Sequence, residues 1–119
     1  MRKSNFRDLH VWEKSKKLCP LLYQLTSSFP NDEKFGVVSQ IRRAAISVSI
    51  NIAEGHGRSS DADFVRFLYI SLGSVREIEA LLEVSLELGF VNDCKVPLEQ
   101  LEEVAKMLTG LIRTLKADG

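Results

Sequence analysis

The sequence predicts an all-α protein in which four helices form an antiparallel up-down-up-down bundle. Three observations support this prediction. Apolar residues recur at helical spacing in four separate segments, and Pro30, Gly55, Gly57 and Gly89 fall at the breaks between those segments. No stretch alternates apolar and polar residues over the length of a strand. Because the connections between the segments are short, consecutive helices are expected to run side by side in opposite directions.

The first helix is expected over residues 7–28 and the second over residues 32–54. Pro20 lies inside the first segment and removes one backbone donor, so it should kink or split this helix. Asn31 can cap the second helix, because its side chain can accept a hydrogen bond from an amide of the first turn. Gly55 is expected to end the second helix in the left-handed conformation that often follows a helix.

The third helix is expected over residues 61–88 and the fourth over residues 97–116. Ser60 is placed to cap the third helix, and Gly89 to stop it. Pro97 introduces the fourth helix, because proline is tolerated at a first helical position. The apolar residues of the fourth helix form one regular stripe: Leu98, Leu101, Val104, Ala105, Leu108, Leu111, Ile112 and Leu115.

Length and composition predict one domain spanning residues 1–119, with a hydrophobic fraction of 45%. No apolar run approaches the length of a membrane span, and the charged N-terminus lacks an apolar signal core, so we expect a cytoplasmic protein. The net charge is zero, but residues 1–60 hold ten Lys/Arg and five Asp/Glu, whereas residues 61–119 hold six and eleven. This asymmetry fits either a basic face opposite an acidic one or pairing between the two halves.

The second and third segments carry more apolar surface than one bundle can cover. Beside its main apolar line, the second segment has Val38, Ala44, Ile46 and Ile50, and the third opens with FVRFLYISLG. Helices that are apolar nearly all round are buried on several sides, which predicts self-association. The interior glycines, Gly73 and Gly110, either permit close helix approach or are tolerated imperfections.

A line of polar residues follows the second segment at steps of three or four, which places them on one stripe of the helix. We refer to these residues as the polar line: Gln40, Arg43, Ser47, Asn51 and Glu54. Ser71, Ser74 and Glu77 have the same spacing on the third segment. Buried polar groups need partners, so the two sets could form a structural seam. The polar line could also face the channel of a ring-shaped oligomer, or a bound ligand or RNA.

The sequence resembles the four-helix-bundle family first described as proteins encoded by intervening sequences in bacterial 23S ribosomal RNA genes. The resemblance is carried by FRDLHVWEKSKKL, QIRRAAISVSINIAEGHGRSS and DFVRFLYISLGSVREIEALLEVSLELGF, and it covers essentially the whole chain in order. The family motif positions correspond to Gln40, Arg42, Arg43, Ser47, Asn51, Glu54 and Gly55.

The resemblance implies a short antiparallel bundle that assembles as a homopentameric ring and has no established enzymatic activity. A related branch serves as the accessory protein of diversity-generating retroelements, where a basic pentameric barrel binds reverse transcriptase and nucleic acid. The neutral net charge of this chain departs from that branch. The basic N-terminal half nevertheless keeps RNA, or a nucleic-acid enzyme such as a reverse transcriptase, as an alternative partner.

Six basic residues are the candidate phosphate contacts for that alternative, since phosphate binding requires positive charge on one face. They are Lys14, Lys16, Lys17, Arg42, Arg43 and Arg58. The phenylalanines occur at core spacing, so aromatic residues that could stack on single-stranded bases are lacking.

No catalytic residue, metal site or cofactor is predicted. His10 and His56 lack a Cys, His or carboxylate partner at metal-ligand spacing, and Glu54 and His56 are expected on a solvated turn without a nucleophile motif. The leading hypothesis is therefore a non-enzymatic, homo-oligomeric scaffold or interaction protein. The alternative is a nucleic-acid-binding accessory protein that uses a basic face of the N-terminal half.

Overall fold

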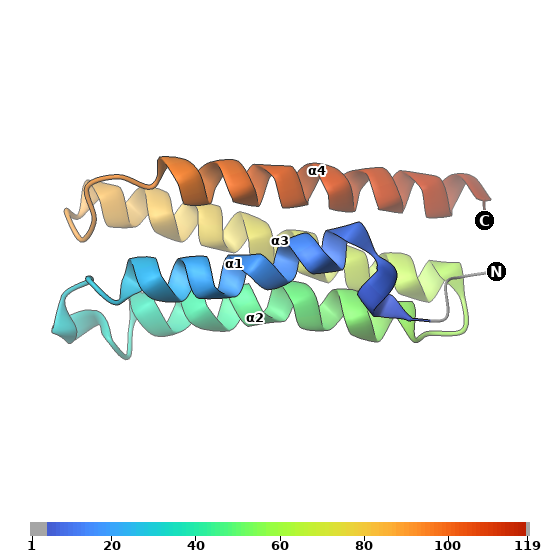
Figure 1. Cartoon of the computed structure of the whole chain (residues 1–119), viewed down its shortest axis with the longest axis horizontal. Coiled ribbons are helices and arrows are strands. Elements are labelled where there is room, and N and C mark those ends of the chain that lie inside the picture. The colour runs from blue at the N-terminus through green and yellow to red at the C-terminus, as the bar shows by residue number, and fades with distance from the viewer. Residues whose placement is uncertain (1–4, 119) are drawn as a thin grey trace.

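The computed structural model describes residues 5–118, and within this range it contains four α-helices and no strand. The all-α prediction is therefore confirmed. The helices lie side by side in an elongated body of 47 × 20 × 19 Å (Figure 1). The elements in chain order are the 3₁₀ turn η1 (Phe6–Asp8), helix α1 (His10–Thr26), the 3₁₀ turn η2 (Asn31–Glu33), and helices α2 (Val37–His56), α3 (Asp61–Glu87) and α4 (Lys95–Asp118).

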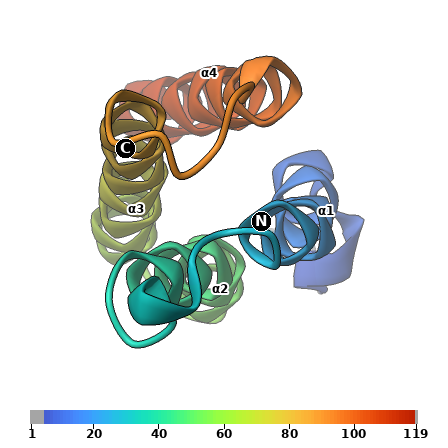
Figure 2. The same cartoon turned by 90° about the vertical axis from the view of Figure 1, so that its left-hand side faces the viewer.

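The chain reverses direction between each pair of consecutive helices, so the start of α1 and the end of α4 lie at the same end of the body (Figure 1). Seen end-on, the helices follow one another around a common axis, with α2 and α4 on opposite sides (Figure 2). Among neighbouring helices, the α2–α3 pair shares the most extensive contact and the α1–α4 pair the least.

Helix α1 begins three residues later and ends two residues earlier than the first predicted helix. Asn5 caps a separate turn by accepting a hydrogen bond from the Arg7 amide at 2.9 Å, and Leu9 is extended between this turn and α1. Pro20 does not split α1, contrary to one of the two expectations. Its missing amide would have bonded the carbonyl of Lys16, and both residues are exposed, so water can donate to that carbonyl instead.

Helix α2 begins at Val37, five residues later than predicted, because residues 31–33 form η2 instead of the first turn of the helix. Asn31 therefore does not cap α2, whose N-cap is Gly36. At the other end, α2 continues to His56, and the prediction that Gly55 ends it in a left-handed conformation is wrong. Gly55 is helical and buried, because α3 approaches it too closely for any side chain.

The signals around α3 are confirmed at both ends. The Asp63 amide donates to the Ser60 hydroxyl at 3.1 Å, which caps the helix, and Gly89 follows its end with φ +77°. Helix α4 begins at Lys95, two residues earlier than predicted. Pro97 is thus its third residue, still within the first turn, where an amide has no partner inside the helix.

All four helices contribute to one hydrophobic core, so each buries one face against the others. Among residues 5–118, none of the helices combines the length and the hydrophobicity of a membrane span. The largest fully buried side chains are Phe64, Leu18, Leu22, Ile41, Ile52, Leu68, Ile78, Leu82, Leu101, Leu108, Val48 and Val75.

Candidate functional site

The middle of the polar line lies against α3. The hydroxyl of Ser74 donates to the hydroxyl oxygen of Ser47 at 3.1 Å, and the buried hydroxyl of Ser71 donates to the carbonyl of Val48 at 2.8 Å. The side-chain amide of Asn51 donates to both the carbonyl and the hydroxyl oxygen of Ser47, each at 2.9 Å. The bonds of Ser74 and Ser71 fix the register of α2 against α3 at its centre, and the Asn51 amide completes the hydrogen bonding of Ser47 within α2.

The two ends of the polar line face solvent. Gln40 and Arg43 line a hollow of about 200 Å³ with Ser47, and α3 adds Ser74 and Glu77 to its walls. Gln40, Arg43 and Glu77 are exposed, and among residues 5–118 neither Arg43 nor Glu77 makes an ion pair. This hollow therefore presents opposite charges that are free to pair with another molecule.

Glu54 closes the other end of the polar line, where it lies 3.9 Å from the guanidinium of Arg58. Both side chains are about half exposed, so this ion pair contributes little to stability. The polar line therefore does not form a single continuous seam between the two helices. Ser47 contacts α3 and Asn51 is half-buried beside it, whereas Gln40, Arg43 and Glu54 lie at the surface.

Exposed apolar side chains concentrate on the outer side of the α2–α3 pair. Within the described residues, nine large hydrophobic side chains are exposed, and only Tyr23 and Val96 belong to α1 and α4. We call the other seven the apolar face: Ile46 and Ile50 of α2, Tyr69, Ile70 and Val84 of α3, Phe35 shortly before α2, and Leu88 directly after α3.

The register of the two helices brings part of the apolar face together. Because Ser47 contacts Ser74 and Val48 contacts Ser71 in antiparallel helices, Ile50 of α2 and Ile70 of α3 lie at the same level. Ile50 is 52% exposed and Ile70 is 42% exposed. Gly73 lies one turn further along α3, and a Cβ added to it would meet no atom within 4 Å. Apolar side chains and an open notch therefore share this surface.

Two of the candidate phosphate contacts on α1 and α2 are held by other groups of the chain. Lys14 forms an ion pair with Glu103 of α4 at 2.9 Å. The guanidinium of Arg42 donates to the Thr26 hydroxyl at 3.0 Å and to the Tyr23 carbonyl at 3.1 Å, and it stacks on the Tyr23 ring. Arg42 therefore ties the end of α1 to α2.

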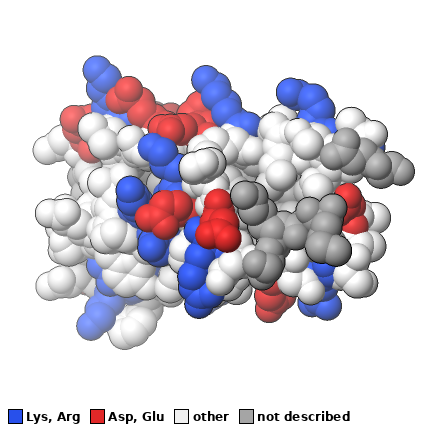
Figure 3. All heavy atoms as spheres, turned by 45° about the vertical axis from the view of Figure 1, so that its right-hand side comes forward, with Lys and Arg blue, Asp and Glu red and all other residues white. Residues whose placement is uncertain are grey.

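The other four candidates are dispersed. Lys16 contacts Glu13 and the Trp12 ring, and Arg58 contacts Glu54, Asp63 and the Phe67 ring. Lys17 and Arg43 are exposed and make no ion pair within the described part of the chain, but they lie on different helices. On the face seen in Figure 3, basic side chains are interspersed with acidic ones. The predicted contacts thus do not form one unpaired phosphate-binding surface.

Arg42→Gln is expected to lower the free energy of unfolding by about 1–2 kcal/mol, because it removes hydrogen bonds from a charged group and a stacking contact. Urea unfolding monitored by circular dichroism measures this change. Arg113→Gln is the matched control, since Arg113 is exposed and makes no ion pair among residues 5–118, and it should stay within about 0.5 kcal/mol of the native chain. Equal stability of the two variants would contradict the anchoring role of Arg42.

His56, one of the groups considered for catalysis, does not lie where the sequence placed it. His56 is buried at the end of α2, edge-on to the Phe64 ring, instead of on the solvated turn that was expected. Within the described range, no group of three or more His, Cys, Asp or Glu residues could hold a metal ion. Burial raises the pKa of the Cys19 and Cys94 thiols, which disfavours the reactive thiolate at both positions.

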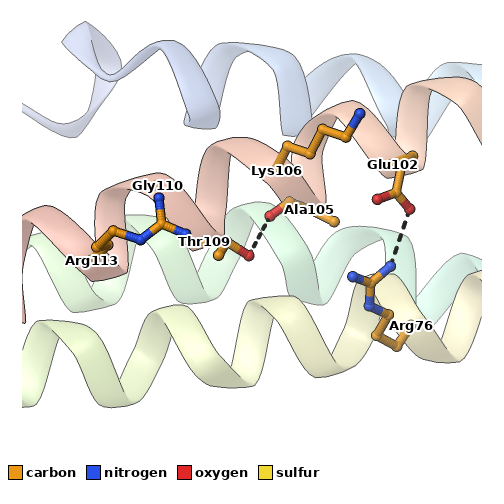
Figure 4. Close-up of a pocket in the computed structure, with 7 residues that line it drawn as sticks. All are labelled: Arg76, Glu102, Ala105, Lys106, Thr109, Gly110 and Arg113. Atoms are coloured by element: carbon orange, nitrogen blue, oxygen red, sulfur yellow. Dashed lines mark hydrogen bonds and ion pairs between the residues drawn. The ribbon is translucent and has the colours of Figure 1, made fainter.

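A second hollow, of about 290 Å³, lies between α3 and α4 and was not predicted from the sequence (Figure 4). Arg76 of α3 and Lys106 and Arg113 of α4 line it, so its basic residues all come from the acidic half of the chain. The seven-residue spacing of Lys106 and Arg113 indicates a shared helix face. Only the packing of α3 on α4 adds Arg76, which is why the sequence alone does not reveal this cluster.

Comparisons with known proteins identify a family and a solved structure of similar fold. The family model for the 23S rRNA-intervening sequence protein matches residues 7–110. The chain is also similar to a Bacteroides thetaiotaomicron protein of unknown function from the S23 ribosomal protein family, for which a crystal structure exists. The two share 27% sequence identity and a TM-score of 0.79, over 87% of this chain and 95% of the other. No curated protein matches the chain.

Proposed function

The chain belongs to the 23S rRNA-intervening sequence protein family, and from this premise we propose that it is a non-enzymatic scaffold that assembles from copies of itself. The outer side of α2–α3 is the proposed contact surface. The proposed working form of the protein is a closed ring of antiparallel up-down-up-down bundles, with five copies as the family resemblance implies. In such a ring, the outer side of α2–α3 of each copy contacts a different surface of the next copy. The alternating direction of the helices in Figure 1 supports the bundle order.

One observation carries this proposal: seven of the nine exposed large hydrophobic side chains in the described range belong to the apolar face. Scattered exposed apolar residues are normal on a protein surface, but a concentration on one helix pair is typical of an interaction surface. A second copy is the occupant that requires no other molecule, and burying these side chains against it would remove them from water.

The charges beside the apolar face support contact between copies. Arg43 and Glu77 flank the smaller hollow without forming an ion pair within residues 5–118, so each can pair with the opposite charge of a neighbouring copy. Complementary charges at the edge of an interface select its register and partner more than they add affinity. In this proposal, the exposed end of the polar line aligns the copies, and the apolar side chains hold them together.

Gly73 provides a test in which monomer stability and assembly respond in opposite directions. Gly73→Ala is expected to stabilise the isolated helix by up to about 1 kcal/mol, because alanine is the better helix former. It should nevertheless raise the dissociation constant of the assembly by about tenfold, because the new methyl group enters a tightly packed contact between copies. Sedimentation velocity over a dilution series measures the dissociation constant.

Gly110→Ala is the matched control for this test. Gly110 is also an interior helical glycine with no atom within 4 Å of an added Cβ, but it lies on α4, outside the apolar face. Its replacement should stabilise the helix by a similar amount and leave the dissociation constant unchanged. An unchanged dissociation constant in both variants would show that Gly73 is not at the contact between copies.

A further inference from the structure

The hollow between α3 and α4 has a charge balance opposite to that of its half of the chain. Residues 61–119 hold six Lys/Arg and eleven Asp/Glu, yet the lining of this hollow contains three basic residues and a single acid, Glu102. Among the described residues, Lys106 and Arg113 form no ion pair. The electrostatic repulsion among Lys106, Arg113 and Arg76 is therefore only partly offset by acidic groups of the chain.

Arg76 is held in place while part of its guanidinium remains available. Its Nη1 atom donates to Glu79 at 2.8 Å and to Glu102 at 3.2 Å. The hydrogen bond to Glu79 is the main reason that the pKa of Arg76 is raised. Both acceptors engage the same nitrogen, so the hydrogens on Nε and Nη2 can still donate to a bound anion.

The α4 side of the hollow is open and uncharged between its two basic residues. An added Cβ at Gly110 would meet no atom within 4 Å, and the Thr109 hydroxyl donates its hydrogen to the Ala105 carbonyl at 2.9 Å. Figure 4 shows Arg113 beside Thr109 and Gly110, and Lys106 with its ammonium directed away from Arg76. The lysine has a flexible four-carbon stem, so it can turn toward a ligand at the rim.

We propose that this hollow binds a compact ligand with two linked phosphate groups. Lys106 and Arg113 are two turns apart on α4, about 10 Å along the helix, and Arg76 faces them from α3. Three cations around one hollow can each contact a different oxygen of a diphosphate, and arginine is well suited to paired phosphate oxygens. A compact diphosphate matches this arrangement, because the three cations line one hollow of about 290 Å³.

The test is isothermal titration calorimetry of the full chain with inorganic pyrophosphate at low salt. The double variant Lys106→Gln/Arg113→Gln is expected to weaken binding by at least about tenfold, because it removes two charge-assisted contacts. Lys17→Gln is the control, since Lys17 is an exposed lysine on α1 without an ion pair among residues 5–118. It should leave the affinity nearly unchanged.

Glu102→Gln is expected to change the affinity for pyrophosphate in the opposite direction. This change takes the only acid from the lining and replaces a charged acceptor of Arg76 Nη1 by a neutral amide, so pyrophosphate binding should become tighter by about threefold. Circular dichroism melts of every variant establish that the fold is retained. Lys106, Arg113 and Glu102 lie outside the apolar face, so these variants should not change the molar mass of the assembly. The test of pyrophosphate binding is therefore independent of the proposed self-association.

Three results would overturn the inference. The first is no binding of pyrophosphate at millimolar concentration to the native chain. The second is an equal loss of affinity in Lys17→Gln and in the double variant, which would indicate general electrostatic attraction. The third is that an RNA hairpin binds through Lys106 and Arg113 while pyrophosphate does not, which would assign the cluster to nucleic acid.

Discussion

Replacing Ile50 and Ile70 together by glutamate is expected to convert the assembly into a folded monomer. Both side chains are about half exposed in the single chain, so the new carboxylates can remain in water and the bundle should stay folded. In a contact between copies they would be buried without a partner, which costs several kcal/mol. We therefore expect the dissociation constant to rise at least about 100-fold. Size-exclusion chromatography with light scattering measures the change.

Val96→Glu is the control for this double variant. Val96 is 57% exposed, which is close to the exposure of Ile50, but it lies on α4 and outside the apolar face. The same chemical change there should leave the assembly intact. If the double variant kept the mass of the native protein, the apolar face would not be the contact surface.

Gly55→Ala is expected to disrupt the packing of α2 on α3. A Cβ at this position would lie 2.6 Å from Cβ of Phe67 and 2.9 Å from Cδ1 of Phe64, distances that require the two helices to move apart. Overpacking of this kind costs about 1–3 kcal/mol, which for a chain of this size lowers the melting temperature by about 4–12 °C. Thermal unfolding followed by circular dichroism measures the effect.

Gly57→Ala separates this clash from a general effect of losing a glycine. Gly57 follows α2 with φ −78°, and an added Cβ would be no nearer than 3.5 Å to any atom. Its replacement should change the melting temperature by no more than about 2 °C. Melting temperatures that agree for the two variants would mean that the α2–α3 distance does not depend on Gly55.

The helices could be predicted from the sequence because their signals are local. Ser60 and Gly89 act through a hydrogen bond and a backbone conformation within a few residues, and both are found as expected. Gly55 was misread because its role depends on a neighbour in space. The close approach of Phe64 and Phe67 requires glycine there, although α2 continues past it to His56.

The candidate sites show the same difference between local signals, which the sequence reveals, and contacts between helices, which it does not. The spacing of the polar line placed Ser47 and Asn51 on one stripe, and they are hydrogen-bonded to each other while Ser47 also contacts Ser74 of α3. The basic residues were less predictable, because charge can be read from the sequence but its partner cannot. The Lys14–Glu103 ion pair joins the first and last helices, and the cluster in the α3–α4 hollow likewise requires the tertiary packing.

The molar mass of the unmodified chain in solution is the most direct test of self-assembly. One chain has a mass of 13.4 kDa. Sedimentation equilibrium at micromolar concentration is expected to give about five times this value, since the apolar face favours association and the family resemblance implies a pentameric ring. A mass of 13.4 kDa at the same concentration would contradict self-assembly and would leave the apolar face without its proposed occupant.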